Sequence, residues 1–350
     1  MHSDPRLQLI QDWLSRDLAL GEYDLRPASA DASFRRYFRV TRGAGGGSLI
    51  VMDAPPDKED VGPYLKVSRL LEGCGVHVPA VHEQDLARGL LLLEDLGGTH
   101  VLTQLESGAA PGPLYSDALA ALAAIQARGA DASRQLDPYD AAVLRREMQL
   151  MPEWFCAKHL ALNLTAEEQG AIAATEEFLI AEALAQPVVF VHRDYHSRNL
   201  MVTVERSPGV IDFQDALRGP AAYDTVSILK DCYVAWPRAR VESWIEEFRS
   251  QLRHHGGAAT ALAGSSLAEY LRWFDLIGLQ RHIKVLGIFA RLNWRDGKPG
   301  YLADLPRTLD YVRETAARFP ELAAFSRLVE SRFVPNLAAA NDRARQVARA

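Results

Sequence analysis

Two neighbouring segments decide the fold: VVFVHRDYHSRNLMV, residues 188–202, and GVIDFQD, residues 209–215. Apolar residues at both ends of the first segment predict two short strands, and the second segment opens with a third. Between the first two strands stands a loop with seven polar or charged residues within eight positions, 192–199. Polar residues crowded between apolar strands are unfavourable for folding. The loop is therefore a candidate functional site.

The loop and the second segment together hold the side-chain oxygens that phosphoryl transfer from a nucleotide needs. Asp194 can orient an attacking hydroxyl and accept its proton, and Asn199 and Asp212 offer the hard oxygen ligands that Mg²⁺ prefers. Residues 192–199 match the kinase catalytic loop H-R-D-x-x-x-x-N, and Asp212 precedes Phe213 as in a kinase metal-binding segment. We therefore predict that Asp194 is catalytic and that Asn199 and Asp212 bind metal.

These segments resemble the catalytic motif of the aminoglycoside phosphotransferase and choline kinase superfamily, H-x-D-x-x-x-x-N followed by I-D-[FW]. The resemblance continues through GPAAYD, residues 219–224. It implies an α+β, protein-kinase-like two-lobed fold, with a β-rich N-terminal lobe and a mainly helical C-terminal lobe, and it implies ATP and Mg²⁺ as cofactors. It also implies that Asp224 caps the following helix and holds the catalytic loop. His192 is expected to hydrogen-bond the loop backbone.

Three further stretches resemble the bacterial anomeric sugar kinases: ASADASFRRYFR at 28–39, VMDAPP at 51–56 and DCYVAWP at 231–237. Those enzymes phosphorylate N-acetylmuramate and N-acetylglucosamine at C1 during cell-wall recycling. The resemblance therefore implies an ATP-dependent sugar kinase that forms a sugar 1-phosphate. Two alternatives stay open. One is another acceptor on the same fold, such as an aminoglycoside, choline or fructosamine, and the other is a nucleotide-binding pseudokinase.

The N-terminal part departs from the family pattern at two points. The strand predicted over residues 49–53 holds no lysine to pair with nucleotide phosphates, and the turn at 31–34 holds no glycine. Arg35, Arg39 or Lys58 could supply the missing charge, and these three remain alternatives. Adenine recognition is expected from the backbone of the hinge. The predicted nucleotide contacts are Ser33, Phe34, Arg35, Arg39, Glu94 and Leu96.

The pattern of apolar residues changes after the strand at 90–94. Before it, strands and turns surround two predicted helices; after it, apolar residues at three- and four-residue steps predict mainly helices. We place the hinge there, with a nucleotide-clasping lobe at 1–96 and a catalytic and acceptor-binding lobe at 97–335. Residues 336–350 are set apart as a terminal tail, in which 338–350, rich in Ala and Arg, are expected to form a frayed helix.

The acceptor site is expected mainly within residues 231–300. This region holds seven Asp and Glu against ten Lys and Arg, whereas the whole chain has a net charge of −6. The balance favours a neutral or anionic acceptor over a polycationic aminoglycoside or choline. The lactyl carboxylate of N-acetylmuramate could meet Arg281, Lys284 or Arg291. The predicted acceptor contacts are His196, Arg198, Asp231, Tyr233, Trp236 and Arg281.

Composition limits the remaining classes of function. The 350 residues are 48% hydrophobic and 24% charged, which is typical of a globular chain of two lobes. The net negative charge argues against nucleic acid as a partner. No secretory signal or membrane-spanning run is visible, and three scattered cysteines predict reduced thiols in a cytoplasmic protein. The sequence indicates no obligate protein partner.

Overall fold

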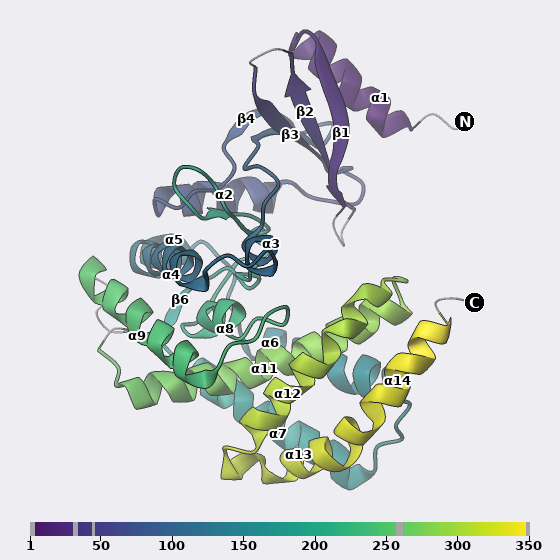
Figure 1. Ribbon diagram of the computed structural model, residues 1–350, viewed down its shortest axis with the longest axis vertical. Helices are drawn as coiled ribbons and strands as arrows, with labels where there is room; N and C mark the ends of the chain where they lie inside the picture. Colours follow the sequence, from purple (N-terminus) through teal and green to yellow (C-terminus); the bar gives the residue numbers. More distant parts are fainter. Residues whose placement is uncertain (1–3, 31–33, 44–45, 257–261, 263, 348–350) are drawn as a thin grey trace.

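The structure, a computed structural model, describes residues 4–30, 34–43, 46–256, 262 and 264–347. A small lobe built on one β-sheet stands above a larger helical lobe (Figure 1). This is the two-lobed α+β architecture that the sequence predicts. None of the helices in the described ranges is long and apolar enough to cross a membrane.

The N-terminal lobe is a five-stranded antiparallel sheet in the order β1-β2-β3-β5-β4. Its strands are β1 (Tyr23–Ala30), β2 (Arg36–Arg42), β3 (Ser48–Asp53), β4 (Val81–Asp85) and β5 (Leu90–Glu94). Strands β2 and β3 are antiparallel neighbours, and next to their turn the Arg42 N–H donates a 3.1 Å hydrogen bond to the Gly47 carbonyl.

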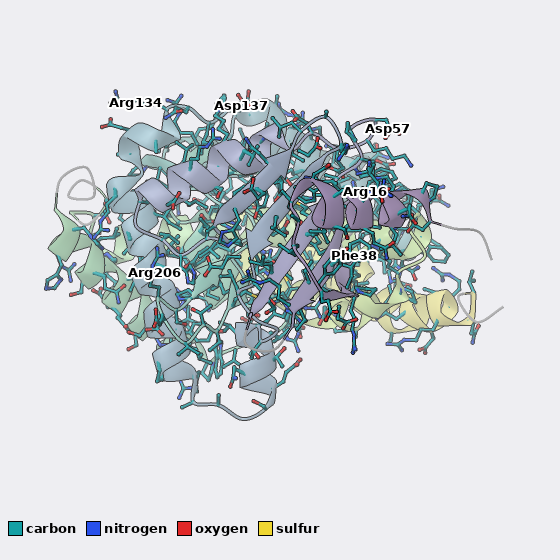
Figure 2. The ribbon with its side chains drawn as sticks, turned by 90° about the horizontal axis from the view of Figure 1, so that it is seen from above. Arg16, Phe38, Asp57, Arg134, Asp137 and Arg206 are labelled. Carbon is teal, nitrogen blue, oxygen red and sulfur yellow. The ribbon has the colours of Figure 1, made fainter. Side chains whose placement is uncertain are left out.

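The two faces of this sheet pack against different helices because side chains alternate along each strand. On the outer face, Phe38 and Val51 are buried against α1 (Pro5–Asp12) and the π-helical turn Trp13–Asp17. Figure 2 labels Phe38 on β2 and Arg16 on that turn. On the other face, Met52 of β3 joins the core shared with α2 (Gly62–Gly73).

Helices make up most of the C-terminal lobe, as the apolar residues at three- and four-residue steps predict. They are α3 (Val101–Glu106), α4 (Pro111–Arg128), α5 (Ala130–Ser133), α6 (Ala141–Met148), α7 (Ala166–Leu184), α8 (Tyr223–Leu229), α9 (Arg238–His255), α11 (Leu267–Trp294), α12 (Leu305–Ala316), α13 (Ala323–Leu328) and α14 (Val334–Val347). Two π-helical stretches, Met151–His159 and Val329–Phe333, and two short 3-10 helices, Pro299–Ala303 and Pro320–Leu322, complete the lobe.

Helix α11 forms the centre of this lobe and contacts α6, α7, α8 and α12. It begins at Ser266, whose side chain accepts a hydrogen bond from the Glu269 N–H and so satisfies one free donor of the first turn. A Cβ at Gly287 would stand 2.3 Å from the Leu150 backbone. Glycine therefore lets α11 approach the chain just before Met151–His159, close to the end of α6.

Two small antiparallel pairs carry the catalytic segments. Strand β6 (Val188–Val191) pairs with β9 (Leu217–Pro220), and β7 (Leu200–Met201) pairs with β8 (Gly209–Val210). In the second pair Leu200 stands opposite Val210, which places the residue before β7 beside the residues after β8. The loop from 192 to 199 therefore meets the start of the second segment.

The C-terminal segment corrects one expectation. Residues 336–350 were expected to be a terminal tail with a frayed helix, but the described part belongs to α14 and is packed into the lobe. Leu337, Ala340 and Ala344 of α14 are buried in the main core. Asn341 accepts a hydrogen bond of 2.9 Å from the buried His159 of the π-helical stretch Met151–His159. Alanine-rich sequence here indicates close helix packing rather than fraying.

Candidate active site

Asn199 connects the two aspartates of the predicted site. Its side-chain nitrogen donates a 3.0 Å hydrogen bond to the backbone carbonyl of Asp194 and a 3.2 Å bond to Oδ2 of Asp212. The backbone adds a second link, because the N–H of Ile211 donates to the carbonyl of Asn199 at 3.1 Å. The structure thus brings together Asp194, Asn199 and Asp212, which are separated by up to 18 positions of sequence.

The backbone on each side of the site adopts conformations that are unusual for residues other than glycine. Arg193 has φ +78° and Asp212 has φ +61°. Such conformations persist where the surroundings fix them, and they concentrate at functional sites. At Arg193, the carboxylate of Asp224 accepts hydrogen bonds from the N–H of His192 at 2.7 Å and of Arg193 at 3.0 Å.

Asp224 therefore holds the catalytic loop, as the resemblance implies. Burial raises the pKa of its carboxyl to about 7, although the two backbone N–H groups favour the charged form. It stands in the first turn of α8, after the N-cap residue Ala222, and makes no N-cap hydrogen bond. The expectation that Asp224 caps this helix is wrong, because both of its oxygens serve the loop.

His192 is completely buried at the start of the loop. Burial lowers the pKa of its imidazole to about 4, so the ring is neutral at ordinary pH. Its Nδ1 accepts a 3.3 Å hydrogen bond from the backbone N–H of Asp194. The geometry agrees with a residue that positions the loop backbone rather than one that transfers protons.

A buried charge cluster beneath the loop is absent from the sequence-based prediction. Glu147 of α6 accepts from Lys284 of α11 at 2.9 Å and forms a short ion pair with Arg193. Its other oxygen accepts from Tyr139 and, at 3.3 Å, from Gln280. Burial alone would raise the pKa of Glu147, but Lys284 and Arg193 hold it below its usual value. The cluster ties α6, α11 and the loop together.

Positive charge surrounds the Asp194 carboxylate. Burial alone would raise its pKa, but the charges of Lys284, His196 and Arg281 outweigh that effect and hold the pKa below its ordinary value. Asp194 is therefore ionised at neutral pH. An ionised carboxylate at this position can accept a hydrogen bond from an acceptor hydroxyl and orient it for attack.

The donors at Asn199 and Asp212 suit a magnesium ion that is shared with phosphates. The side-chain nitrogen of Gln214 donates a 2.9 Å hydrogen bond to Oδ1 of Asp212 and fixes its orientation. Among the described residues no group of three or more carboxylate, imidazole or thiol side chains could hold a metal by itself. A metal ion here would complete its coordination with phosphate oxygens and water, which is how Mg²⁺ is usually bound with nucleotides.

The N-terminal lobe reaches this site through Arg35, whose guanidinium lies 3.7 Å from Oδ1 of Asp212. Arg39 instead binds Asp95, at 2.6 and 3.0 Å, and also donates to the carbonyl of Gly97. Phe34 is 61% exposed at the end of the turn. Ser33, predicted with them, lies outside the described residues.

The hinge after β5 holds two of the predicted nucleotide contacts, Glu94 and Leu96. The Glu94 carboxylate points away towards His77 and the N–H of Ala80, at 3.0 and 3.2 Å. The buried Leu96 packs close to Gly209. In the described part of the chain no group hydrogen-bonds to the backbone N–H or carbonyl of Leu96. The adenine contact expected at this backbone stays a prediction.

Comparison with known proteins agrees with this geometry. The model of the phosphotransferase enzyme family matches residues 24–263, which include both catalytic segments and most of the N-terminal lobe. The chain belongs to the phosphotransferase enzyme family. It is therefore an enzyme of the kinase type.

Curated relatives of this phosphotransferase cover nearly all of it. An N-acetylmuramate/N-acetylglucosamine kinase of Pseudomonas aeruginosa is 46% identical over 95% of this chain and 98% of its own length. A protein of the same name from Neisseria meningitidis is 43% identical, over 92% of this chain and 94% of its own.

Solved structures show the same fold at low sequence identity. The Plasmodium vivax ethanolamine kinase has a TM-score of 0.62 and 13% identity, covering 93% of this chain and 92% of that one. An aminoglycoside phosphotransferase in complex with gentamicin has a TM-score of 0.57 and 18% identity, covering 88% and 97%. At these identities the likeness concerns the fold, which these proteins share with the phosphotransferase.

Three predicted acceptor residues of the phosphotransferase form one cluster beside the loop. The Arg198 guanidinium lies 3.7 Å from the centroid of the Tyr233 ring, and the His196 ring meets Tyr233 edge-on at 5.4 Å. Arg198 is exposed, whereas His196 and Tyr233 are half-buried. One face of Tyr233 is thus already covered, which leaves Arg198 and the rim of the cluster to meet a ligand.

Two other predicted acceptor residues make contacts within the protein. Asp231 is completely buried; one oxygen accepts from the N–H and hydroxyl of Ser197 and the other from the N–H of Tyr233. Trp236 donates its indole N–H to Tyr115 and packs edge-on against Trp244. Asp231 therefore anchors the loop, and Trp236 contributes to an aromatic core.

Arg281 is the predicted acceptor residue with the most favourable environment for an anion. It lies on α11, is only 4% exposed, and contributes to the positive field at Asp194. Within the described ranges no carboxylate lies within ion-pair distance of it, and its guanidinium donates to the sulfur of Cys232 at 3.7 Å. A buried cation without a carboxylate partner is unfavourable unless a ligand completes its environment.

Proposed function

We propose that this phosphotransferase transfers the γ-phosphoryl group of ATP to the anomeric hydroxyl of N-acetylmuramate and N-acetylglucosamine, releasing the sugar 1-phosphate. The main support is the match to curated kinases of that name, which are 43–46% identical over 92% or more of this chain. The match includes the acceptor region as well as the catalytic loop. Both sugars belong to peptidoglycan, so we assign the reaction to cell-wall recycling in the cytoplasm.

The arrangement at Asp194, Asn199 and Asp212 supports the chemistry. Asp194 would orient the anomeric hydroxyl and accept its proton as the new bond to phosphorus forms. Asn199 and Asp212 would hold Mg²⁺, which when bound offsets charge on the phosphates. ADP leaves with the electron pair of the broken bond. The backbone of Glu94 and Leu96 would bind the adenine ring, and closure of the lobes would exclude water.

Arg281 is our candidate for recognition of the lactyl carboxylate. Of the other two basic residues considered, Lys284 is bound to Glu147 and to the Tyr223 hydroxyl at 3.2 Å. Arg291 lies ten residues further along the same helix, about 15 Å from Arg281. Arg281 is the one of the three that lies beside Asp194 without a carboxylate partner among the described residues.

The reaction is tested by incubating the protein with ATP, Mg²⁺ and each of a panel of acceptors, and by following the products with phosphorus NMR. The panel contains both amino sugars, an aminoglycoside, choline and a fructosamine. We expect a sugar phosphate whose phosphorus couples to the anomeric proton, formed from both amino sugars. Turnover of one of the other acceptors alone would overturn the choice of acceptor. ATP binding without turnover of any acceptor would instead indicate a pseudokinase.

A further inference from the structure

Strand β3, with the sequence SLIVMD, holds no lysine or arginine. Protein kinases pair a lysine on this strand with a glutamate on the following helix and with the nucleotide phosphates. Here Met52 of β3 and Tyr64 of α2 are both buried in the same hydrophobic core. The Tyr64 ring packs against the ring of Phe213, the residue that follows Asp212, with the two ring centroids 4.8 Å apart. Buried apolar and aromatic side chains thus stand on β3 and α2, the two elements that carry the ion pair in a kinase.

Several nearby cations already have structural partners. Arg36 binds Asp53 and Asp4, and so fastens α1 to the sheet. Arg39 is held by Asp95 at the hinge through two hydrogen bonds. The Lys58 ammonium is exposed and lies 4.9 Å from the centroid of the Phe34 ring. None of these three is directed at the catalytic segments.

Arg35 differs from them in its position. It directly precedes β2, and alternation along the strand places it on the same face as Tyr37, which pairs with Met52 of β3. Its side chain is only 10% exposed and reaches across to Asp212, with the guanidinium 3.7 Å from Oδ1. Arg35 therefore presents its charge where a metal on Asp212 would meet the phosphates.

We infer that Arg35 takes the place of the strand lysine and pairs with the α- and β-phosphates of the nucleotide, its charge supplied from the start of β2 rather than from β3. The inference rests on the proposed function, because it concerns the same nucleotide. A guanidinium suits this role, since its planar array of N–H groups can bind two phosphate oxygens at once. The larger reach of arginine compensates for the displacement by one strand.

The test is isothermal titration calorimetry of the full chain with Mg²⁺-ADP and, separately, with adenosine. The variants are Arg35→Ala, Arg35→Lys and, as a matched control, Lys58→Ala. We expect Arg35→Ala to weaken ADP binding about 10- to 100-fold, because the phosphates lose a charged hydrogen-bonding partner. Adenosine binding should change less than about twofold, because adenosine carries no phosphate. Arg35→Lys should recover part of the ADP affinity, and Lys58→Ala should match the wild type.

The outcomes separate this inference from the proposed function. ADP affinity unchanged in Arg35→Ala overturns the inference and leaves the proposed function standing. Equal loss of ADP and adenosine affinity also overturns it, because Arg35 would then support the fold of the lobe rather than the phosphates. Wild-type protein that binds neither ADP nor adenosine would overturn the proposed function itself, and the inference with it.

Discussion

At the scale of single residues, Arg281 offers a way to tell the two proposed sugars apart. Arg281→Gln removes the buried positive charge. Of the two sugars only N-acetylmuramate carries a carboxylate, so only this sugar would lose an ionic partner. We expect kcat/KM for N-acetylmuramate to fall about 10- to 100-fold, as for other charged hydrogen bonds. The value for N-acetylglucosamine should stay within about threefold.

The control for this prediction is Arg291→Gln on the same helix, which should leave both kcat/KM values near those of the wild type. Equal losses for both sugars in Arg281→Gln would contradict the assignment. They would indicate that Arg281 serves the phosphates or the field at Asp194, both of which are common to the two reactions.

Glu147 is the residue on which the buried cluster depends. Glu147→Ala would leave Lys284 and Arg193 buried without their shared carboxylate, and such a loss destabilises by about 3–5 kcal/mol. Glu177→Ala is the matched control, because Glu177 is 64% exposed and pairs with Arg145 at the surface. Its loss should cost less than about 1 kcal/mol. Urea denaturation measures the free energy of unfolding of both variants. Similar losses in Glu147→Ala and Glu177→Ala would show that the buried cluster contributes little to stability.

The residues of the site differ in how far sequence could predict them. Asp194, Asn199 and Asp212 lie in one local pattern, and the pairing of β7 with β8 joins them. Glu147 stands on a helix 46 residues before its partner Arg193. Only the tertiary packing of α6 against α11 and the loop brings such a charge to the site, so no local spacing marks it.

At the scale of elements, α14 depends on the neutral form of His159. This imidazole is completely buried, donates from Nε2 to Asn341 and accepts at Nδ1 from the Trp294 indole at 3.3 Å. Burial lowers the pKa of His159 to about 4, whereas in the unfolded chain it is about 6.5. Between these values the unfolded chain binds more protons, so stability is fully present above pH 6.5 and falls as pH drops towards 4.

The measurement is urea denaturation at pH 7.5 and 5.0, for wild type and His159→Gln. Between these pH values His159 should lower the free energy of unfolding of the wild type by about 2 kcal/mol. This follows from about 1.4 kcal/mol for each pH unit below 6.5. The glutamine variant keeps a donor towards Asn341 but does not titrate, so its loss should be smaller by that amount. The same pH dependence in both proteins would contradict the role given to His159.

Elements with regular apolar spacing were predicted, and those without it were missed. Strand β5 has the expected range of 90–94, and the chain after it is mainly helical, as its apolar steps of three and four residues predict. Strands β1 and β4 were not predicted, because their sequences lack an apolar alternation: β4 reads VHEQD and its residues are exposed or half-buried. Strand β4 forms because it lies at the edge of the sheet and pairs with the buried β5.

At the scale of the whole molecule, the hinge after β5 separates two lobes that meet at the site. The small lobe contributes Arg35 and the hinge backbone, and the large lobe contributes the loop, Asp212 and α11. The two-lobed α+β fold was predicted from sequence, and the division near residue 96, where the pattern changes from strands to helices, stays a prediction. Sequence could not show which of Arg35, Arg39 and Lys58 approaches the site. These residues differ in the partners that they contact, and those partners are known only from the folded structure.

The most direct test compares Asp194→Asn with the wild type in consumption of ATP with Mg²⁺ and N-acetylmuramate. The control is Asp137→Asn, because Asp137 is exposed and is labelled in Figure 2. Phosphoryl transfer guided by Asp194 predicts a fall in kcat of about 100- to 10,000-fold, with an unchanged melting temperature and wild-type activity in the control. An Asp194→Asn protein that still forms the sugar phosphate at the wild-type rate would contradict it.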